Sequence, residues 1–145
     1  MAEIFPDEGL DLILSVITGN AAAPANLYMG LFTSQTASTV PARGAVLATQ
    51  TGVTEASGTD YARVQVTPGN WAGPATNGNG RRRTSVQKTF ATVGAGGWGT
   101  VNGFFISDSL TSGVALYYAN FDDTTANALN AGDVQKVTPA MQFDG

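Results

Sequence analysis

The sequence predicts a mainly β protein: a single antiparallel β-sandwich or jelly-roll-like domain over residues 1–145, with one short N-terminal α-helix. Three observations lead to this prediction. Short strand-like apolar segments recur along the chain, and clusters of Gly, Asn, Asp, Ser and Pro separate them. The alternation of strands with helices that is typical of a parallel α/β sheet is missing. A chain of 145 residues is also long enough to bury one core.

The predicted helix covers residues 7–18. Asp7 and Glu8 give it an acidic first turn, which suits the positive end of the helix dipole. Apolar residues then recur at helical spacing: Leu10, Ile13, Leu14 and Ile17. Gly19 ends the pattern. We expect the apolar stripe to pack on the body of the domain or on a neighbouring subunit.

The predicted strands follow the helix. They are residues 26–32, 45–49, 61–66, 87–93, 101–106, 114–121 and 134–138. Residues 108–113 are the clearest tight connection and should join two antiparallel strands. Two long linkers interrupt the pattern, at 34–42 and 67–85. The second is unusually long for a connection inside a compact domain, and we expect it to be an exposed loop that contacts a neighbouring subunit.

The composition favours a protein that is packed against partners. Charged residues make up 12% of the chain, about half the usual ~25%. Such a surface has little charge repulsion to keep neighbours apart, although many Thr- and Gly-rich β domains share this property. The net charge of −4 argues against a nucleic-acid partner. No apolar segment is long enough for a membrane anchor, and the acidic residues before Leu10 argue against a secretory signal.

The residue inventory predicts no enzyme and no cofactor. The chain has no His and no Cys, so the commonest general base and the thiol nucleophile are missing. Two carboxylates can still cleave a sugar. The candidates for that reaction are Glu55, Asp60, Asp108, Asp122, Asp123 and Asp133. Most of them lie beside Gly, Ser or Thr at strand ends, where an Asp side chain bonds the turn backbone. The adjacent Asp122 and Asp123 supply too few ligands for calcium, so no metal site is predicted.

The candidate partner-interface residues lie in the 67–85 linker: Trp71, Arg81, Arg82 and Arg83. Arginine forms bidentate bonds to carboxylates and is enriched at interfaces, so this run can contact an acidic protein surface. The competing interpretation is a solvated loop tip, and a nucleic-acid contact ranks third. Trp71 either anchors the loop to its own domain or inserts into a partner.

Taken in order, several segments resemble a known group of proteins. The helical LDLIL is followed by NLYMGLF, TDYARVQV, GWGTVNGFFISD, ALYYANF and a late GDV. This order resembles small virion structural proteins of tailed bacteriophages, described as capsid decoration (cement) or tail-fibre-like proteins, over about residues 10–134. Asp60 stands where Gly is more usual, and the triple arginine is not part of the pattern.

The resemblance implies a non-enzymatic virion structural protein. The favoured expectation is a cement protein on the capsid exterior that binds the major capsid protein and stabilises the assembled shell. The alternative is a tail-associated adaptor or a receptor- or glycan-binding module, and a glycan-cleaving enzyme is a remote third. A homo-oligomer is expected in either location, and the resemblance points to a trimer.

Overall fold

The computed structural model describes residues 2–35, 39–121 and 127–143. Its largest sheet has five antiparallel strands in the order β1-β9-β8-β2-β3. Their bounds are β1 Glu3–Ile4, β9 Ala115–Asn120, β8 Gly103–Ser107, β2 Leu27–Phe32 and β3 Val64–Val66. The connection at 108–113 joins β8 to β9 as an antiparallel pair, which confirms that prediction.

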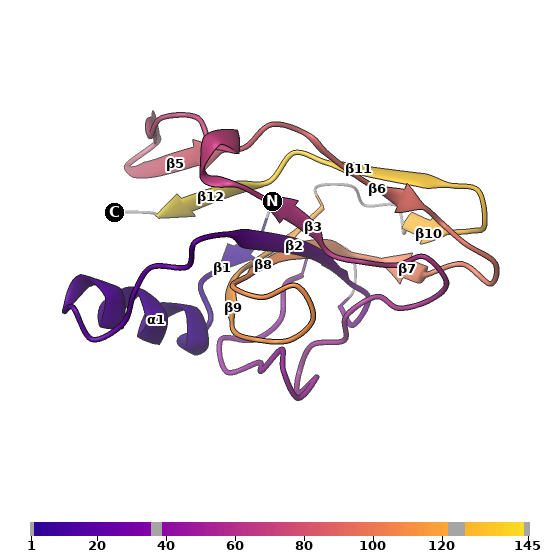
Figure 1. Cartoon of the computed structure of the whole chain (residues 1–145), viewed down its shortest axis with the longest axis horizontal. Helices are drawn as coiled ribbons and strands as arrows, with labels where there is room; N and C mark the ends of the chain where they lie inside the picture. The colour runs from indigo at the N-terminus through magenta and orange to yellow at the C-terminus, as the bar shows by residue number, and fades with distance from the viewer. Residues whose placement is uncertain (1, 36–38, 122–126, 144–145) are drawn as a thin grey trace.

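Three smaller antiparallel sheets complete the described strands. They are β12-β5-β4, β11-β6 and β10-β7. Their bounds are β4 Ala75–Asn77, β5 Gly80–Thr84, β6 Lys88–Thr92, β7 Gly99–Val101, β10 Asn127–Leu129, β11 Val134–Val137 and β12 Ala140–Phe143. In Figure 1, β5, β12, β11 and β6 form a layer above the five-stranded sheet. The predicted fold class, mainly antiparallel β with one N-terminal helix, is therefore confirmed.

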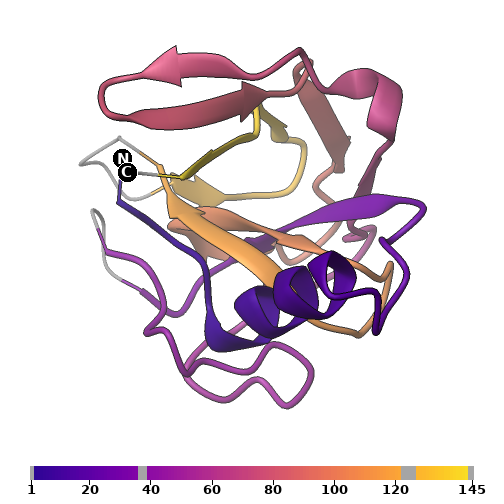
Figure 2. The ribbon, with the colours of Figure 1, turned by 90° about the vertical axis from the view of Figure 1, so that its left-hand side faces the viewer.

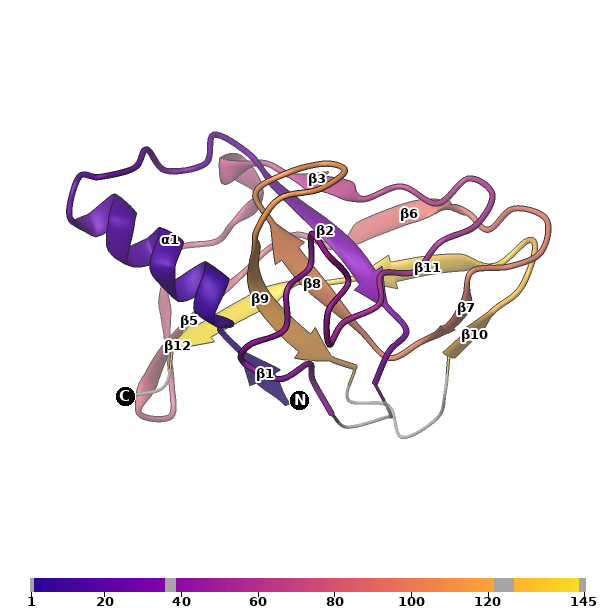
Figure 3. The same ribbon diagram turned by 90° about the horizontal axis from the view of Figure 1, so that it is seen from below.

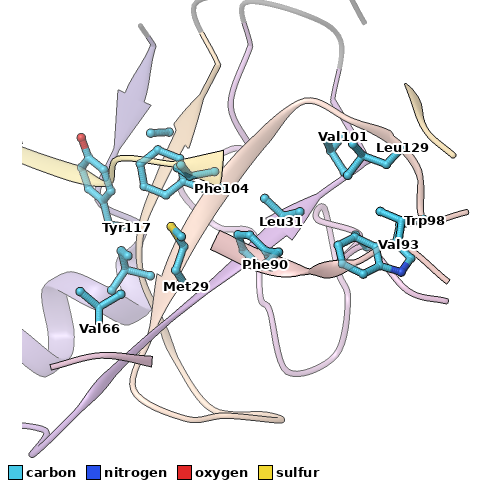
Figure 4. Close-up of a cluster of buried hydrophobic side chains, with 14 of the residues drawn as sticks. Met29, Leu31, Val66, Phe90, Val93, Trp98, Val101, Phe104, Tyr117 and Leu129 are labelled. Atoms are coloured by element: carbon cyan, nitrogen blue, oxygen red, sulfur yellow. The ribbon is translucent and has the colours of Figure 1, made fainter. Parts of the chain in front are cut away.

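Both faces of the five-stranded sheet are buried. Successive side chains of a strand point to opposite faces, so Phe104 enters the core between the two layers and Phe105 enters a second core. Figure 4 shows the first of these cores, where Met29 and Leu31 of the sheet lie beside Phe90 of β6 in the upper layer; Trp98, from the β6–β7 connection, belongs to the same cluster. This double burial explains why β8 and β9 are apolar at nearly every position.

The second core is covered by the segment that connects β2 to β3. Leu47 and Val53 from this segment pack with Phe32, Phe105 and Tyr118 of the sheet. Figure 3 shows the segment crossing in front of β8 and β9. The strand predicted at 45–49 is wrong, because this stretch forms a turn with an isolated bridge between Val46 and Thr51.

The helix α1 spans Asp7–Ile17, within one residue of the predicted range. It packs on β9 next to the short strand β1. Gly9 makes this close approach possible, because a Cβ atom there would lie 2.5 Å from the carbonyl oxygen of Leu116. The helix therefore covers an edge of β9 that would otherwise be open to pairing with another chain.

The interpretation of 67–85 as one loop is wrong, although nearly all of these residues are exposed or half-buried, as expected. A 3-10 turn at Pro68–Asn70 is followed by the β4–β5 hairpin, and β5 also pairs with β12. The hairpin turn consists of Gly78 and Asn79, and Gly78 has a φ of 56°, which suits a two-residue turn. This segment forms strands and not a loop because β12, far away in the sequence, supplies β5 with a second partner strand.

Two other strand predictions need correction. The strand predicted at 101–106 is split into β7 and β8 at Asn102, whose side chain donates a hydrogen bond to the carbonyl of Thr33. The strand predicted at 61–66 is reduced to β3, because Tyr61 and Arg63 turn inward to bond Glu55. Asp60, at the position where Gly is more usual in the resembled proteins, has a φ of 65°, a conformation that glycine adopts without strain.

Candidate protein-interaction groove

An apolar groove of about 400 Å³ lies between α1 and the β5–β12 pair. One wall is formed by the helix, through Leu12, Ile13, Val16 and Ile17. The opposite wall includes Trp71, Arg83 and Met141, and Arg83 and Met141 are cross-strand neighbours on β5 and β12. Figure 2 shows α1 and the β4–β5 hairpin on opposite sides of this end of the molecule. A largely apolar cleft of this size on the surface is a candidate binding site.

The structure brings only two of the four predicted interface residues into the groove. Trp71 and Arg83 line it, whereas Arg82 is half-buried and Arg81 is exposed outside the lining. Arg81 donates hydrogen bonds to the Thr76 hydroxyl and to the carbonyl of Pro74. The three arginines therefore do not form a solvated loop tip, because they belong to strand β5, which pairs with β12.

Trp71 combines both of the roles that the sequence left open. It is half-buried and packs against the first core, so it anchors its own segment. The same side chain forms part of the groove wall, where a partner can contact it. Tryptophans in such positions are often the residues that dominate binding energy.

The helix adds exposed apolar surface beside the groove. The side chain of Leu14 is 59% exposed and that of Ile17 is 75% exposed. Single exposed apolar residues are ordinary, but Ile17 is itself part of the apolar wall, and Leu14 lies next to it on the same helix. The surface around the groove therefore favours contact with another apolar surface over contact with water.

Among the carboxylates that the sequence offered for catalysis, Asp108 and Asp133 bond the backbone of turns. Asp108 accepts a hydrogen bond from the backbone N–H of Val114 at 2.7 Å, and Asp133 accepts one from Asn130 at 2.8 Å. Both are turn contacts of the kind that the sequence indicated. Asp122 and Asp123 lie outside the described residues. Among the residues that are described, no three His, Cys, Asp or Glu side chains gather in a way that could hold a metal ion.

A buried ion pair between Arg63 and Glu55 was not predicted from the sequence. Two guanidinium nitrogens of Arg63 lie 2.8 and 2.7 Å from the two carboxylate oxygens of Glu55. A third nitrogen donates to the carbonyls of Ser109 and Ser112 in the β8–β9 connection. No signal in the sequence indicated this site, because Arg63 alternates with apolar residues as an exposed strand residue would.

Further contacts surround this ion pair. Arg63 lies over the ring of Phe105, 4.9 Å from its centroid. The hydroxyl of Tyr61 donates to Glu55 and accepts from the backbone N–H of Leu31. Burial, followed by the negative charge of Glu55, raises the pKa of Tyr61 well above its usual range. The Tyr61 hydroxyl therefore stays protonated, donates one hydrogen bond and accepts another, and links Glu55 to the backbone of β2.

The match to known proteins comes from a family of phage proteins. The family model described as podophage GP4 fiber I protein gp80 matches residues 10–142, from the helix to the last strand. This chain belongs to that family. Membership makes it a virion structural protein of a bacteriophage, as the order of its motifs indicated. No curated protein matches the chain. Among the described residues, no helix is long and apolar enough to cross a membrane.

Proposed function

We propose that this protein is a non-enzymatic subunit of the phage fibre apparatus, and that it joins protein subunits of the virion through the groove between α1 and β5–β12. The observation that carries the proposal is the exposed apolar surface at this groove, where Ile17 of the helix wall is 75% exposed. The printed family description, a fiber protein, supports the fibre as its location.

The physical chemistry of the groove suits subunit binding. Covering the exposed parts of Leu14 and Ile17 contributes on the order of 1–2 kcal/mol each. Trp71 offers a fixed aromatic surface, because its own packing on the core already orders it. A preordered site loses little conformational entropy on binding, so more of the contact energy appears as affinity.

A non-enzymatic role is supported by three of the carboxylates that the sequence offered for catalysis. Glu55, Asp108 and Asp133 are all engaged in turn or ion-pair contacts. Neither His nor Cys is present to replace them as a base or nucleophile. Binding is therefore the function that these residues support best.

Capsid decoration is the second candidate location. It is favoured by the absence of a repeat of fixed period in the sequence, since a fibre shaft is usually built from repeats. In that role the protein would bridge neighbouring major capsid subunits, and binding only to the assembled shell would stabilise it by mass action.

Labelling and composition of purified particles test these proposals together. We expect an antibody to this protein to decorate the tail in electron micrographs. We expect Ile17→Asp to reduce the amount of protein in the particles, while Leu110→Asp, which changes an exposed residue outside the groove, does not. Both variants should keep their thermal midpoints.

Two results would change the proposal. Label on the capsid, together with DNA release at a lower temperature from particles lacking the protein, would establish decoration instead. Normal incorporation of a folded Ile17→Asp variant would show that the groove is not the attachment surface.

A further inference from the structure

Each copy of the chain carries a strip of exposed residues on α1 and a groove of matching character. Asp11, Leu14 and Ile17 lie three residues apart along α1, and all three are exposed. The groove lining outside the helix is apolar apart from Asn26 and Arg83, and it includes Trp71 and Met141. One surface therefore presents apolar side chains with a carboxylate, and the other presents apolar side chains with a guanidinium.

The carboxylate of this strip is free to pair with another molecule. Most carboxylates of the described residues are engaged: Glu3 with Tyr117, Asp7 with Arg43, Glu8 with the Leu47 N–H, Glu55 with Arg63, Asp108 with Val114 and Asp133 with Asn130. Within the described part of the chain, Asp11 has no hydrogen bond or ion pair. It is the exposed acidic residue of the helix without a partner, and it lies one turn before Leu14.

The guanidinium of Arg83, in the groove, also has no partner among the described residues. Arg43 and Arg63 are ion-paired, and Lys88 donates to the side chain of Asn70. Arg83 has no hydrogen bond or ion pair to any residue in the described segments, although it is exposed and lines the groove. Its strand lies between β4 and β12, so its backbone is held in place while the side chain remains available.

We infer that the groove receives the outward strip of α1 from a second copy of this chain, with Asp11 of one copy on Arg83 of the other. The charge complementarity selects this occupant. A partner for the groove needs an apolar surface with a nearby unpaired carboxylate, and α1 supplies both on every copy. An arginine–carboxylate pair is directional, so it would fix how the apolar surfaces meet.

The inference deepens the proposed function and rests on it, because it names the partner that the groove binds. Since the strip on α1 and the groove wall opposite the helix are different surfaces of one chain, copies can be linked head to tail around a closed ring. A ring of three agrees with the trimer that the sequence resemblance implies. The low charged fraction, 12%, leaves little repulsion to oppose the contact.

A charge exchange in the purified full chain tests the inference. Analytical ultracentrifugation over a concentration series should show the wild type associating. Asp11→Arg and Arg83→Glu should each weaken association by about tenfold or more, because each places like charges together. The double variant should regain most of the lost affinity, because it restores the pair with the charges exchanged.

The controls separate the specific pair from a general effect of charge. Lys136→Glu reverses one exposed cation that does not line the groove, and we expect wild-type association from it. Every variant should melt at the wild-type temperature. A wild type that stays monomeric at high micromolar concentration would overturn the inference, as would a double variant that associates no better than the single ones.

The outcome for the proposed function is read separately, on particles. If the wild type is monomeric in solution while Ile17→Asp still fails to enter particles, the groove binds a different virion subunit. In that case the proposed function stands and the inference about the second copy falls. If Ile17→Asp enters particles normally, the proposed attachment surface falls, whatever the purified protein does.

Discussion

Replacing Arg63 by Met should destabilise the fold more than any change to an exposed charge. The side chain of Arg63 is only 2% exposed, and that of its partner Glu55 is 16% exposed. Methionine fills a similar volume but donates no hydrogen bonds. The change therefore leaves Glu55 largely buried without its cation, and the carbonyls of Ser109 and Ser112 without their donor.

The magnitude follows from the burial. Removing one partner of a buried ion pair costs about 3–5 kcal/mol, because the charge that remains has lost its solvation. The entropy of unfolding of a chain of 145 residues is about 0.3 kcal/mol per kelvin, from about 2.1 cal/mol per kelvin per residue. The thermal midpoint should therefore fall by about 10–16 °C.

Calorimetry or thermal circular dichroism at neutral pH measures this shift. The matched control is Arg43→Met, because Arg43 pairs with Asp7 at the same 2.7 Å but both side chains are more than half exposed, at 62% and 57%. That change should cost less than about 1 kcal/mol. The variant Arg63→Met/Glu55→Leu should recover most of the loss, since no buried charge is then left unpaired.

Equal melting temperatures of Arg63→Met and Arg43→Met would contradict this expectation. That result would mean that burial does not raise the cost of losing the cation. Failure of the double variant to recover would show that the hydrogen bonds to the β8–β9 connection, and not the buried charge of Glu55, account for the stability.

Two further predictions concern helix packing and alkaline pH. Gly9→Ala should lower stability by about 1–3 kcal/mol although alanine favours helices, because its Cβ would meet the Leu116 carbonyl at 2.5 Å; Gly44→Ala, which meets nothing within 4 Å, should not. Burial is the largest cause that raises the pKa of Tyr61, Tyr117 and Tyr118 above the ordinary value of 10.0. Above pH 10 the unfolded chain loses protons that the folded chain keeps, so stability should fall as pH rises. The chain has four tyrosines, so absorbance from more than one tyrosinate near pH 10 without unfolding would contradict this.

The sequence by itself determined the elements whose signals are local. The helix at residues 7–18 is apparent because its acidic first turn, apolar stripe and terminal glycine all lie within a few residues of one another. The strands β2, β6, β8, β9 and β11 overlap the predicted segments for the same reason. The order of the motifs also carried the resemblance to phage virion proteins, which the family match confirms at that level.

Only the tertiary structure decided the roles of the polar residues. Arg63 alternates with apolar residues as an exposed residue would, and it is buried because Glu55 and the β8–β9 connection come to it from other parts of the chain. Arg81 to Arg83 form a strand because β12, about sixty residues away, supplies its pairing partner. The groove, likewise, is lined by α1, Trp71 and β12 together. The reason is the same in each case: the burial, pairing or cavity depends on contacts between segments that are distant in the sequence, and a local pattern carries no information about them.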